Sequence, residues 1–327
     1  MKWTLAPVLA VFVGLASGCE SPPPTPRAPK VPTAFAFGVI GDAPYRTMDV
    51  TRYRQALGEI NASDVALVLH VGDLLSGPCD DAVIAARAAE MQALRPAVVY
   101  TPGDNEWTDC HRSSAGDYQP LERLAFVRRT FFADPARSLG TASIPVETQS
   151  ADTAWAEAVE NQRWKIGKVV FATLHLVGSG NGGAKFKGRT AADDRASARR
   201  LDAALAWMAQ TYSLADSLGA PTVVLAFHAN IGFGSRDGIR DGYESFVPAL
   251  RRHAAAFAGR TLMIHGDTHD FHYDQALTDS TGAPLPRAWR LETWGSPRVG
   301  WVRVVVDSVS GDILQVDSRR SQLLGIY

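Results

Sequence analysis

Apolar and polar positions alternate in blocks along the first third of the chain. Three short runs rich in Val, Leu, Ile and Phe stand at residues 34–42, 65–73 and 97–104, and each ends in Gly followed by Asp. Continuous apolar runs of this length are typical of strands buried on both faces of a parallel sheet. The segments between them, residues 48–63 and 80–94, have the composition and length of helices. The pattern therefore predicts a βαβαβ unit.

The same alternation continues to the end of the chain. Further strands are predicted within residues 164–178 as a pair with a turn at Gly167, and within 221–230, 260–270 and 287–316. Further helices are predicted within residues 118–132, 191–218 and 244–257. The sequence therefore predicts an α/β protein, and no second linker divides it after residue 34.

Composition and charge limit the classes of function. With 327 residues, of which 46% are hydrophobic and 20% charged, the chain can bury the core of one large domain or two small ones. Its 33 basic and 34 acidic residues nearly cancel. No broad positive field is therefore present to bind nucleic acid through its phosphates, and a phosphate group has to be bound locally.

The N-terminal segment predicts export. Residues 1–18 contain one Lys, an apolar stretch and small residues before Cys19, as in a secretory signal peptide. The run "LASGC" resembles a bacterial lipoprotein signal, which implies lipidation of Cys19; cleavage by an ordinary signal peptidase is the alternative. Residues 19–33 are rich in Pro and predict an extended tether. We therefore expect a periplasmic or outer-membrane lipoprotein that contacts the membrane through its lipid anchor alone, with one domain at residues 34–327.

Two further cysteines, Cys79 and Cys110, follow the second and third predicted strands. In an oxidising compartment an even pair of cysteines permits a disulfide. Two unrelated buried thiols are the alternative at this point.

Carboxylate and imidazole side chains follow five of the predicted strands. They are Asp42, Asp73, Asp104, His228, and the pair Asp267 and His269. In an open α/β sheet, ligands bind at the carboxyl ends of the strands. One such Asp alone could cap a helix. Together, however, these groups would repel one another and destabilise the fold unless a cation lies among them, so the pattern indicates one or two bound metal ions.

The motifs around these residues carry a family resemblance. "GDAP", "GDLL", "GDNE", "FHAN" and "GDTH" occur in this order between residues 34 and 307. The chain resembles the calcineurin-like metallophosphoesterase family, whose motifs run D-x-H, G-D-x-x, G-N-H-[ED], a lone His after an apolar strand, and G-H-x-H. The resemblance implies a four-layer α/β/β/α sandwich of two mixed β-sheets flanked by helices. It also implies two divalent metal ions and hydrolysis of a small phosphorylated substrate.

The resemblance assigns the metal ligands residue by residue. One ion would be held by Asp42, Asp73 and His269, and the other by Asp73, Asp104, His228 and Asp267, so that Asp73 bridges them. Pro44 stands where the family has a His ligand, which weakens the first site unless water, Tyr45 or substrate completes it. Asp104 and Asp267 replace an Asn and a His of the family pattern, which changes the charge of the site from about −2 to about −4. This oxygen-rich set favours Mn²⁺, iron or Mg²⁺ over Zn²⁺.

The resemblance also implies roles for residues close to the ligands. Asn105 stands where the family has a His, and Asn can donate a hydrogen bond to a phosphate but cannot transfer a proton. His111 and His272 are therefore the candidates for the catalytic acid, and Glu106 is a candidate for support of the ligands. Cys79 and Cys110 each lie six residues after a ligand Asp, beyond strands that the family fold places side by side, which implies a disulfide.

The Gly-rich segment at residues 178–189 leaves two readings open. It could bring Lys185 or Arg189 over a bound anion, or it could be a flexible surface loop. The function is open in the same way. A catalytically silent surface lipoprotein that binds a ligand or partner, and a mononuclear metal hydrolase, are the alternatives to a two-metal phosphoesterase.

Overall fold

The computed structural model describes Met1, residues 33–233 and residues 239–321. The predictions for residues 2–32, which include Cys19 and nearly all of the signal peptide and tether, lie outside this part. Among the described helices, none combines the length and the apolarity that crossing a membrane requires.

The first of two mixed sheets contains the predicted βαβαβ unit. Its order is β12-β11-β1-β2-β3, formed by Ile313–Arg320, Gly300–Asp307, Ala34–Ile40, Leu67–His70 and Ala97–Tyr100. The strands β1, β2 and β3 are parallel, whereas β11 is antiparallel to both β1 and β12. The three parallel strands are shorter than the apolar runs that predicted them, because the last residues of each run already belong to the following turn.

The second sheet contains the downstream strands. Its order is β4-β5-β6-β7-β8-β10-β9, formed by Glu147–Thr148, Gln162–Ile166, Val169–Thr173, Thr222–Ala226, Arg260–His265, Ala288–Glu292 and His272–Asp274. The central strands β6, β7, β8 and β10 are parallel, and β5 and β9 pair with them in the antiparallel direction. The predicted strand pair β5 and β6 turns at Gly167, which has φ 57°. The short strands β4 and β9 were not predicted, since three or fewer residues give no periodic signal.

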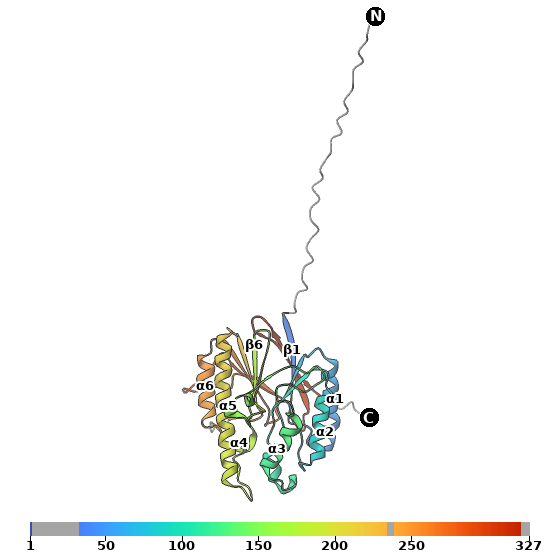
Figure 1. Ribbon diagram of the computed structural model, residues 1–327, viewed down its shortest axis with the longest axis vertical. Helices are drawn as coiled ribbons and strands as arrows, with labels where there is room; N and C mark the ends of the chain where they lie inside the picture. The colour runs from blue at the N-terminus through green and yellow to red at the C-terminus, as the bar shows by residue number, and fades with distance from the viewer. Residues whose placement is uncertain (2–32, 234–238, 322–327) are drawn as a thin grey trace. The chain divides into compact units, whose positions relative to one another are not determined.

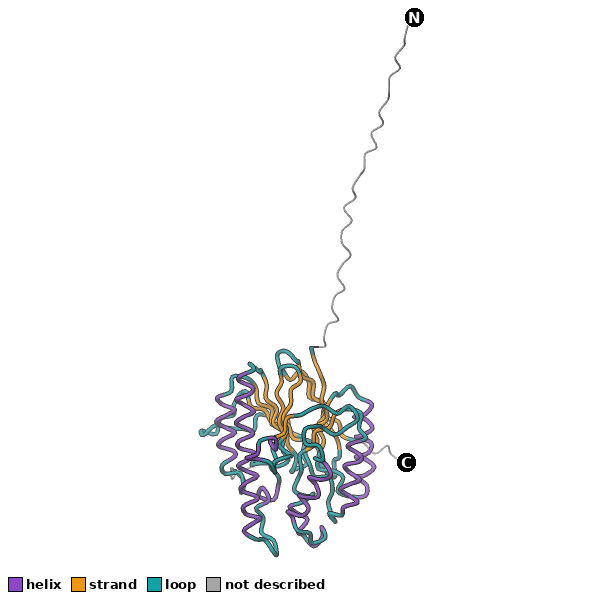
Figure 2. Tube along the Cα trace, viewed as in Figure 1, coloured by secondary structure: helices purple, strands orange, loops and turns teal. Residues whose placement is uncertain are grey.

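Helices cover the outer face of each sheet. Figure 1 shows α1 (Thr47–Ala62) and α2 (Asp81–Gln92) on one side of the strands, and α5 (Ala191–Ser217) and α6 (Phe246–Ala256) on the other. The helix α3 (Pro120–Phe131) packs with α2, and the single turn α4 (Gly178–Gly182) follows β6. Figure 2 shows the strands gathered between these helices.

Alternating side chains divide the strands between two kinds of core. In β1, Phe37 and Val39 belong to the core between the sheets, together with Phe171 of β6. Their neighbour Ile40 instead packs in the core beneath α1 and α2, with Tyr53. A third core joins β6 and β7 to α5 and α6. The layers are therefore helices, sheet, sheet and helices, as the prediction of an α/β/β/α sandwich with two mixed sheets requires.

Candidate metal centre

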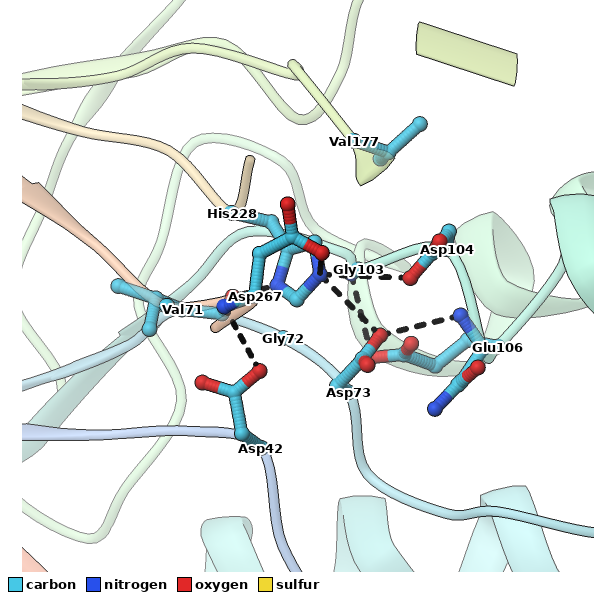
Figure 3. A network of polar contacts seen from close by, with 12 residues as sticks. Asp42, Val71, Gly72, Asp73, Gly103, Asp104, Glu106, Val177, His228 and Asp267 are labelled. Carbon is cyan, nitrogen blue, oxygen red and sulfur yellow. Dashed lines mark hydrogen bonds and ion pairs between the residues drawn. The ribbon is translucent and has the colours of Figure 1, made fainter. Parts of the chain in front are cut away.

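The six predicted metal ligands follow the carboxyl ends of five parallel strands. They are Asp42 after β1, Asp73 after β2, Asp104 after β3, His228 after β7, and Asp267 and His269 after β8. Their side chains converge from the two sheets, and Figure 3 shows five of the six. We call these six residues the ligand cluster.

Two overlapping groups of the cluster have the spacing of a metal site. Ligand atoms of Asp42, Asp73 and His228 lie within 4.8 Å of one another, and so do those of Asp104, His228 and Asp267. The resemblance assigned His228 to one ion. In the structure His228 belongs to both groups.

Both histidines present the same ring nitrogen to the carboxylates. His228 Nδ1 lies 2.8 Å from the carbonyl oxygen of Val71, and His269 Nδ1 lies 2.7 Å from that of Ser296. A carbonyl can only accept, so Nδ1 of each ring donates and Nε2 keeps a free lone pair in the neutral ring. The Nε2 of His269 lies 3.7 Å from Asp42 Oδ1. This is the tautomer that a metal-binding histidine needs.

The Nε2 atom of His228 lies at the centre of the cluster. It is 3.4 Å from Asp73 Oδ1, 3.3 Å from Asp104 Oδ1 and 3.9 Å from Asp267 Oδ1 (Figure 3). The side chain is fully buried. Three carboxylates that follow different strands thus surround one ring nitrogen.

Four members of the cluster have unusual backbone conformations. Asp42, Asp73, Asp267 and His269 have φ values of 51°, 58°, 78° and 66°. The left-handed region costs a residue with a side chain of the order of 1 kcal/mol or more, and such outliers gather at functional sites. The backbone at each of these positions therefore adopts an unfavourable conformation that directs the side chain into the cluster.

Backbone amides fix one oxygen of several carboxylates. The amide of Asn105 donates to Asp73 Oδ1 at 3.0 Å, and the amide of Asp267 donates to Asp42 Oδ1 at 2.9 Å. The amide of Asn230 donates to Asp267 Oδ2 at 2.9 Å. These bonds hold each carboxylate in one orientation, so the cluster is largely preorganised.

Two glycines allow the backbone to approach the carboxylates closely. A Cβ atom on Gly266 would lie 2.1 Å from Asp42 Oδ2. A Cβ atom on Gly178 would lie 2.5 Å from Asp104 Oδ2 and 2.9 Å from Asp267 Oδ1. Any larger residue at either position would therefore displace a carboxylate of the cluster.

The pKa shifts report a large excess of negative charge. Burial, together with the charge of Asp267, raises the pKa of Asp42 to about 8. Burial likewise raises the pKa of Asp73 well above its usual range, with a contribution from Asp104. Burial opposes the charged form of His228, but the charges of Asp73 and Asp104 still raise the pKa of its imidazole. In Asp104, the effect of burial is outweighed by the close imidazole of His228 and by the hydrogen bond from Ser179, so the pKa of that carboxyl is lowered.

The donor set fits a divalent cation. Asp42 Oδ2 and His228 Nε2 are buried and have no hydrogen-bond partner among the described residues. Such atoms are costly to bury unless something binds them. Carboxylate oxygens suit Mn²⁺, Mg²⁺ and iron, and imidazole nitrogen suits iron and Mn²⁺ better than Mg²⁺. One or two such ions would neutralise the excess negative charge of the four carboxylates in the ligand cluster.

The alternative role of the three aspartates of the first sheet, as caps of the following helices, is not seen in the structure. Helix α1 has Arg46 at its N-cap, and α2 has Asp80 there. The 3₁₀ helix after β3 begins at Thr108, with Trp107 at the N-cap. The aspartates at 42, 73 and 104 therefore cap no helix.

The structure gives contacts to the residues predicted beside the ligands. Glu106 is buried and accepts from Tyr100 Oη at 2.9 Å and from the amide of Gly103 at 3.3 Å. Its carboxylate thus holds the turn that carries Asp104. His111 stacks on Phe186, with ring centroids 4.9 Å apart. Its Nδ1 lies 2.6 Å from the carbonyl oxygen of Thr108, and no hydrogen bond or ion pair among the described residues joins His111 to the ligand cluster.

A disulfide joins Cys79 to Cys110 across 31 residues, with Cα atoms 5.8 Å apart. The pairing is the one that the resemblance implied. It connects the loop after Asp73 to the loop after Asp104, and both cysteines are fully buried. In the chain-entropy account, closing a loop of this length contributes about 3 to 4 kcal/mol of stability.

The Gly-rich segment contributes a residue that sequence reasoning missed. Ser179 Oγ lies 2.9 Å from Asp104 Oδ2 and 2.7 Å from Asp109 Oδ1. The segment was considered for Lys185 or Arg189, but Arg189 instead donates to the carbonyl oxygen of Gly182 at 3.0 Å and holds the loop together. The Gly-rich composition was the available signal for this loop, but it did not single out Ser179.

Tyr45 stands beside the position that Pro44 occupies. Its hydroxyl donates to Asp73 Oδ2. Its ring meets the ring of His269 edge-on, with centroids 5.1 Å apart. Tyr45 therefore lies on the side of the ligand cluster where Pro44 replaces the histidine of the family pattern.

Comparisons with known proteins do not identify a family. No protein-family model matches the sequence, and no curated protein matches it. One solved protein, described only as a crystal structure, is 10% identical with a TM-score of 0.44, over 88% of this chain and 99% of its own. The C. elegans NitFhit protein is 11% identical with a TM-score of 0.28, over 88% of this chain and 59% of its own. Both scores are too low to carry an argument about function.

Proposed function

We propose that this protein is an exported, metal-dependent hydrolase of phosphate esters. The observation that carries the proposal is the ligand cluster, in which Asp42 Oδ2 and His228 Nε2 are buried and unpartnered among four carboxylates. The motif resemblance supports phosphate as the reacting group. The N-terminal pattern and the disulfide support an oxidising compartment outside the cytoplasm.

The ligand cluster would hold the ions. The proposed sets are Asp42, Asp73 and His269 for one ion, and Asp73, Asp104, His228 and Asp267 for the other. When bound, divalent ions neutralise phosphoryl oxygens and bring substrate and water together. Mn²⁺, iron and Mg²⁺ are proposed ahead of Zn²⁺, because four of the six ligands are carboxylates.

The remaining residues of the site orient groups more than they transfer protons. Asn105 fixes Asp73 through its backbone amide, and its side chain can donate a hydrogen bond to a phosphoryl oxygen. His111 is the proposed acid, but its contacts hold it against Phe186 and the carbonyl oxygen of Thr108. We therefore expect esters with good leaving groups to react much faster than alkyl esters.

The test is to measure the metal content of the purified full-length chain and its hydrolysis of phosphomonoesters and phosphodiesters. Mn²⁺, Fe²⁺, Mg²⁺ and Zn²⁺ are added in turn, and Asp73→Ala and His228→Ala are assayed in parallel. The proposal predicts metal-dependent hydrolysis that either variant reduces on the order of 10³-fold, since each loses several kcal/mol of metal binding and charge stabilisation. Metal binding without hydrolysis would favour the catalytically silent binding protein.

A further inference from the structure

A cavity of about 740 Å³ opens beside the ligand cluster. Asp267 forms part of its wall, so the cavity borders directly on the metal centre. One side is formed by the turn α4, through Gly178, Ser179 and Gly180, and the other by residues 239–243. Its volume is several times that of an inorganic phosphate, which leaves room for an organic group.

The α4 wall is held in a costly conformation. Ser179, Gly180 and Asn181 have φ values of 52°, 63° and 53°, so three successive residues form a left-handed turn. Left-handed residues normally occur singly, because a side chain there meets the following carbonyl. Tyr243 fixes the turn, since its hydroxyl donates to the carbonyl oxygen of Val177 and accepts from the amide of Asn181 at 3.3 Å. The wall is thus preformed, as a binding surface requires.

Arg240 is the one cationic side chain among the described residues that line the cavity. Its Nη1 atom lies 3.5 Å from Asp267 Oδ2, at the end of the cavity nearest the metal centre. The side chain is 46% exposed, so the guanidinium can reach a molecule in the cavity. A guanidinium binds phosphate through two parallel hydrogen bonds.

The charge of the site assigns a role to this arginine. Four ionised carboxylates are neutralised by two divalent ions, so a metal-loaded cluster has little charge left for Arg240 to balance. Arg240 then supplies positive charge at the edge of the cavity. Asn105, which is uncharged, cannot supply it.

We infer that Arg240 binds the phosphoryl oxygens of the substrate, and that the cavity beside it receives the organic group of a phosphate ester. This inference rests on the proposed function. The competing role for Arg240 is a counter-ion of Asp267 that never contacts substrate.

Inorganic phosphate is the probe that separates the two roles. Its binding to the Mn²⁺-loaded full-length chain is measured by calorimetry for the native protein, Arg240→Ala, Arg240→Lys and Arg298→Ala. Arg298 is the matched control, because it is 44% exposed and pairs with Asp270, which is outside the cluster. We expect phosphate to bind about 10- to 100-fold more weakly to Arg240→Ala, with a smaller loss in Arg240→Lys and none in Arg298→Ala.

Metal stoichiometry is measured in the same variants, and the inference predicts that Arg240→Ala keeps the native value. Phosphate affinity unchanged in Arg240→Ala, or lost together with the metal, would overturn it. Phosphate binding that depends on Arg240 in a protein that hydrolyses no ester would overturn the proposed activity and leave the anion site standing. Hydrolysis that Arg240→Ala leaves unchanged would overturn the role of Arg240 and leave the proposed activity standing.

Phenylphosphonate, which is not hydrolysed, tests the cavity. The native protein is expected to bind it more tightly than inorganic phosphate, because its ring is removed from water. Ala184→Trp, which fills the cavity from the wall opposite Arg240's segment, should abolish that advantage while leaving phosphate affinity unchanged. Equal affinity of both probes in the native protein would overturn the role of the cavity.

Discussion

Two groups of buried charge in this protein are balanced in opposite ways. Glu160 is 1% exposed, but Arg128 Nε lies 2.6 Å from its Oε1 and His175 Nδ1 lies 3.5 Å away. The ligand cluster contains four carboxylates, and among the described residues the half-exposed Arg240 is the arginine that forms an ion pair with one of them. We call Glu160, Arg128 and His175 the Glu160 group.

The pKa shifts follow the difference in counter-charge. Burial alone would raise the pKa of Glu160, but Arg128 and His175 lower it well below its usual range. Burial raises the pKa of Asp42 to about 8, because the charge of the nearby His228 lowers it too little to offset the effect of burial. The charge of a buried carboxylate can be neutralised by a cationic side chain, as in Glu160. A buried carboxylate that lacks such a partner needs a bound cation instead. The comparison therefore separates a structural ion pair from a binding site.

The largest expected effect comes from breaking the Glu160 group. Glu160→Gln leaves the partly buried Arg128 without its counter-charge, and we expect it to lower the free energy of unfolding by about 3 kcal/mol. Urea unfolding of the full-length chain, with and without Mn²⁺, measures the change. The loss should be the same in both conditions.

Asp42→Asn is the matched variant from the ligand cluster. It replaces a carboxyl that has to take up a proton on folding with a side chain that is always neutral, so the metal-free protein should be as stable as the native protein or more stable. Mn²⁺ should stabilise it less than the native protein, because a ligand is gone. Equal destabilisation of Asp42→Asn and Glu160→Gln in the metal-free state would show that the two groups do not differ.

The pH dependence of the stability of the metal-free protein tests whether Asp42 is protonated in the folded state. Asp42 has a pKa of about 8 in the folded state against an ordinary value of 3.8, so the folded protein retains a proton that the unfolded chain releases. The stabilisation from that proton is complete below pH 4 and is lost as the pH rises through 8. The stability of the native protein relative to Asp42→Asn should therefore fall between pH 4 and 8 in the presence of chelator. A difference that stays constant across this range would show that Asp42 is already ionised.

The smallest expected effect concerns Ser179. Its hydroxyl bonds to Asp104 Oδ2 and thereby leaves Oδ1 facing His228. Ser179→Ala should weaken Mn²⁺ binding about 10-fold, as is usual when a group that orients a ligand is removed. Ser197→Ala is the control, since Ser197 donates to a carbonyl oxygen in the same turn without contacting the cluster. Equal effects of both variants would indicate a general disturbance of the turn.

Much of the fold could be predicted because its strands are buried on both faces. The runs at 34–42, 65–73 and 97–104 are mostly apolar up to the Asp that ends each of them, and these Asp residues mark the carboxyl ends of the strands. The same regularity located the ligand cluster. A short side chain after a buried strand can only lie at one edge, so the sequence order of these residues was enough to bring them together.

What the sequence could not predict depends on contacts between distant segments. The left-handed turn at Ser179 is stabilised by Tyr243 and Arg200, which come from other parts of the chain and bind its backbone. Arg240 reaches Asp267 from a loop with no periodic pattern. Such positions follow from tertiary packing, which overrides local preference.

Mn²⁺ binding to the chelator-treated full-length chain tests whether the ligand cluster binds a divalent cation. At pH 7 the raised pKa values of Asp42 and His228 mean that the metal-free cluster holds protons that a divalent cation must displace. Calorimetric titrations in two buffers with different ionisation enthalpies count those protons. The account predicts tight binding with release of about one proton or more per chain, and loss of both in Asp73→Ala. No binding, or binding with the same heat in both buffers, would contradict it.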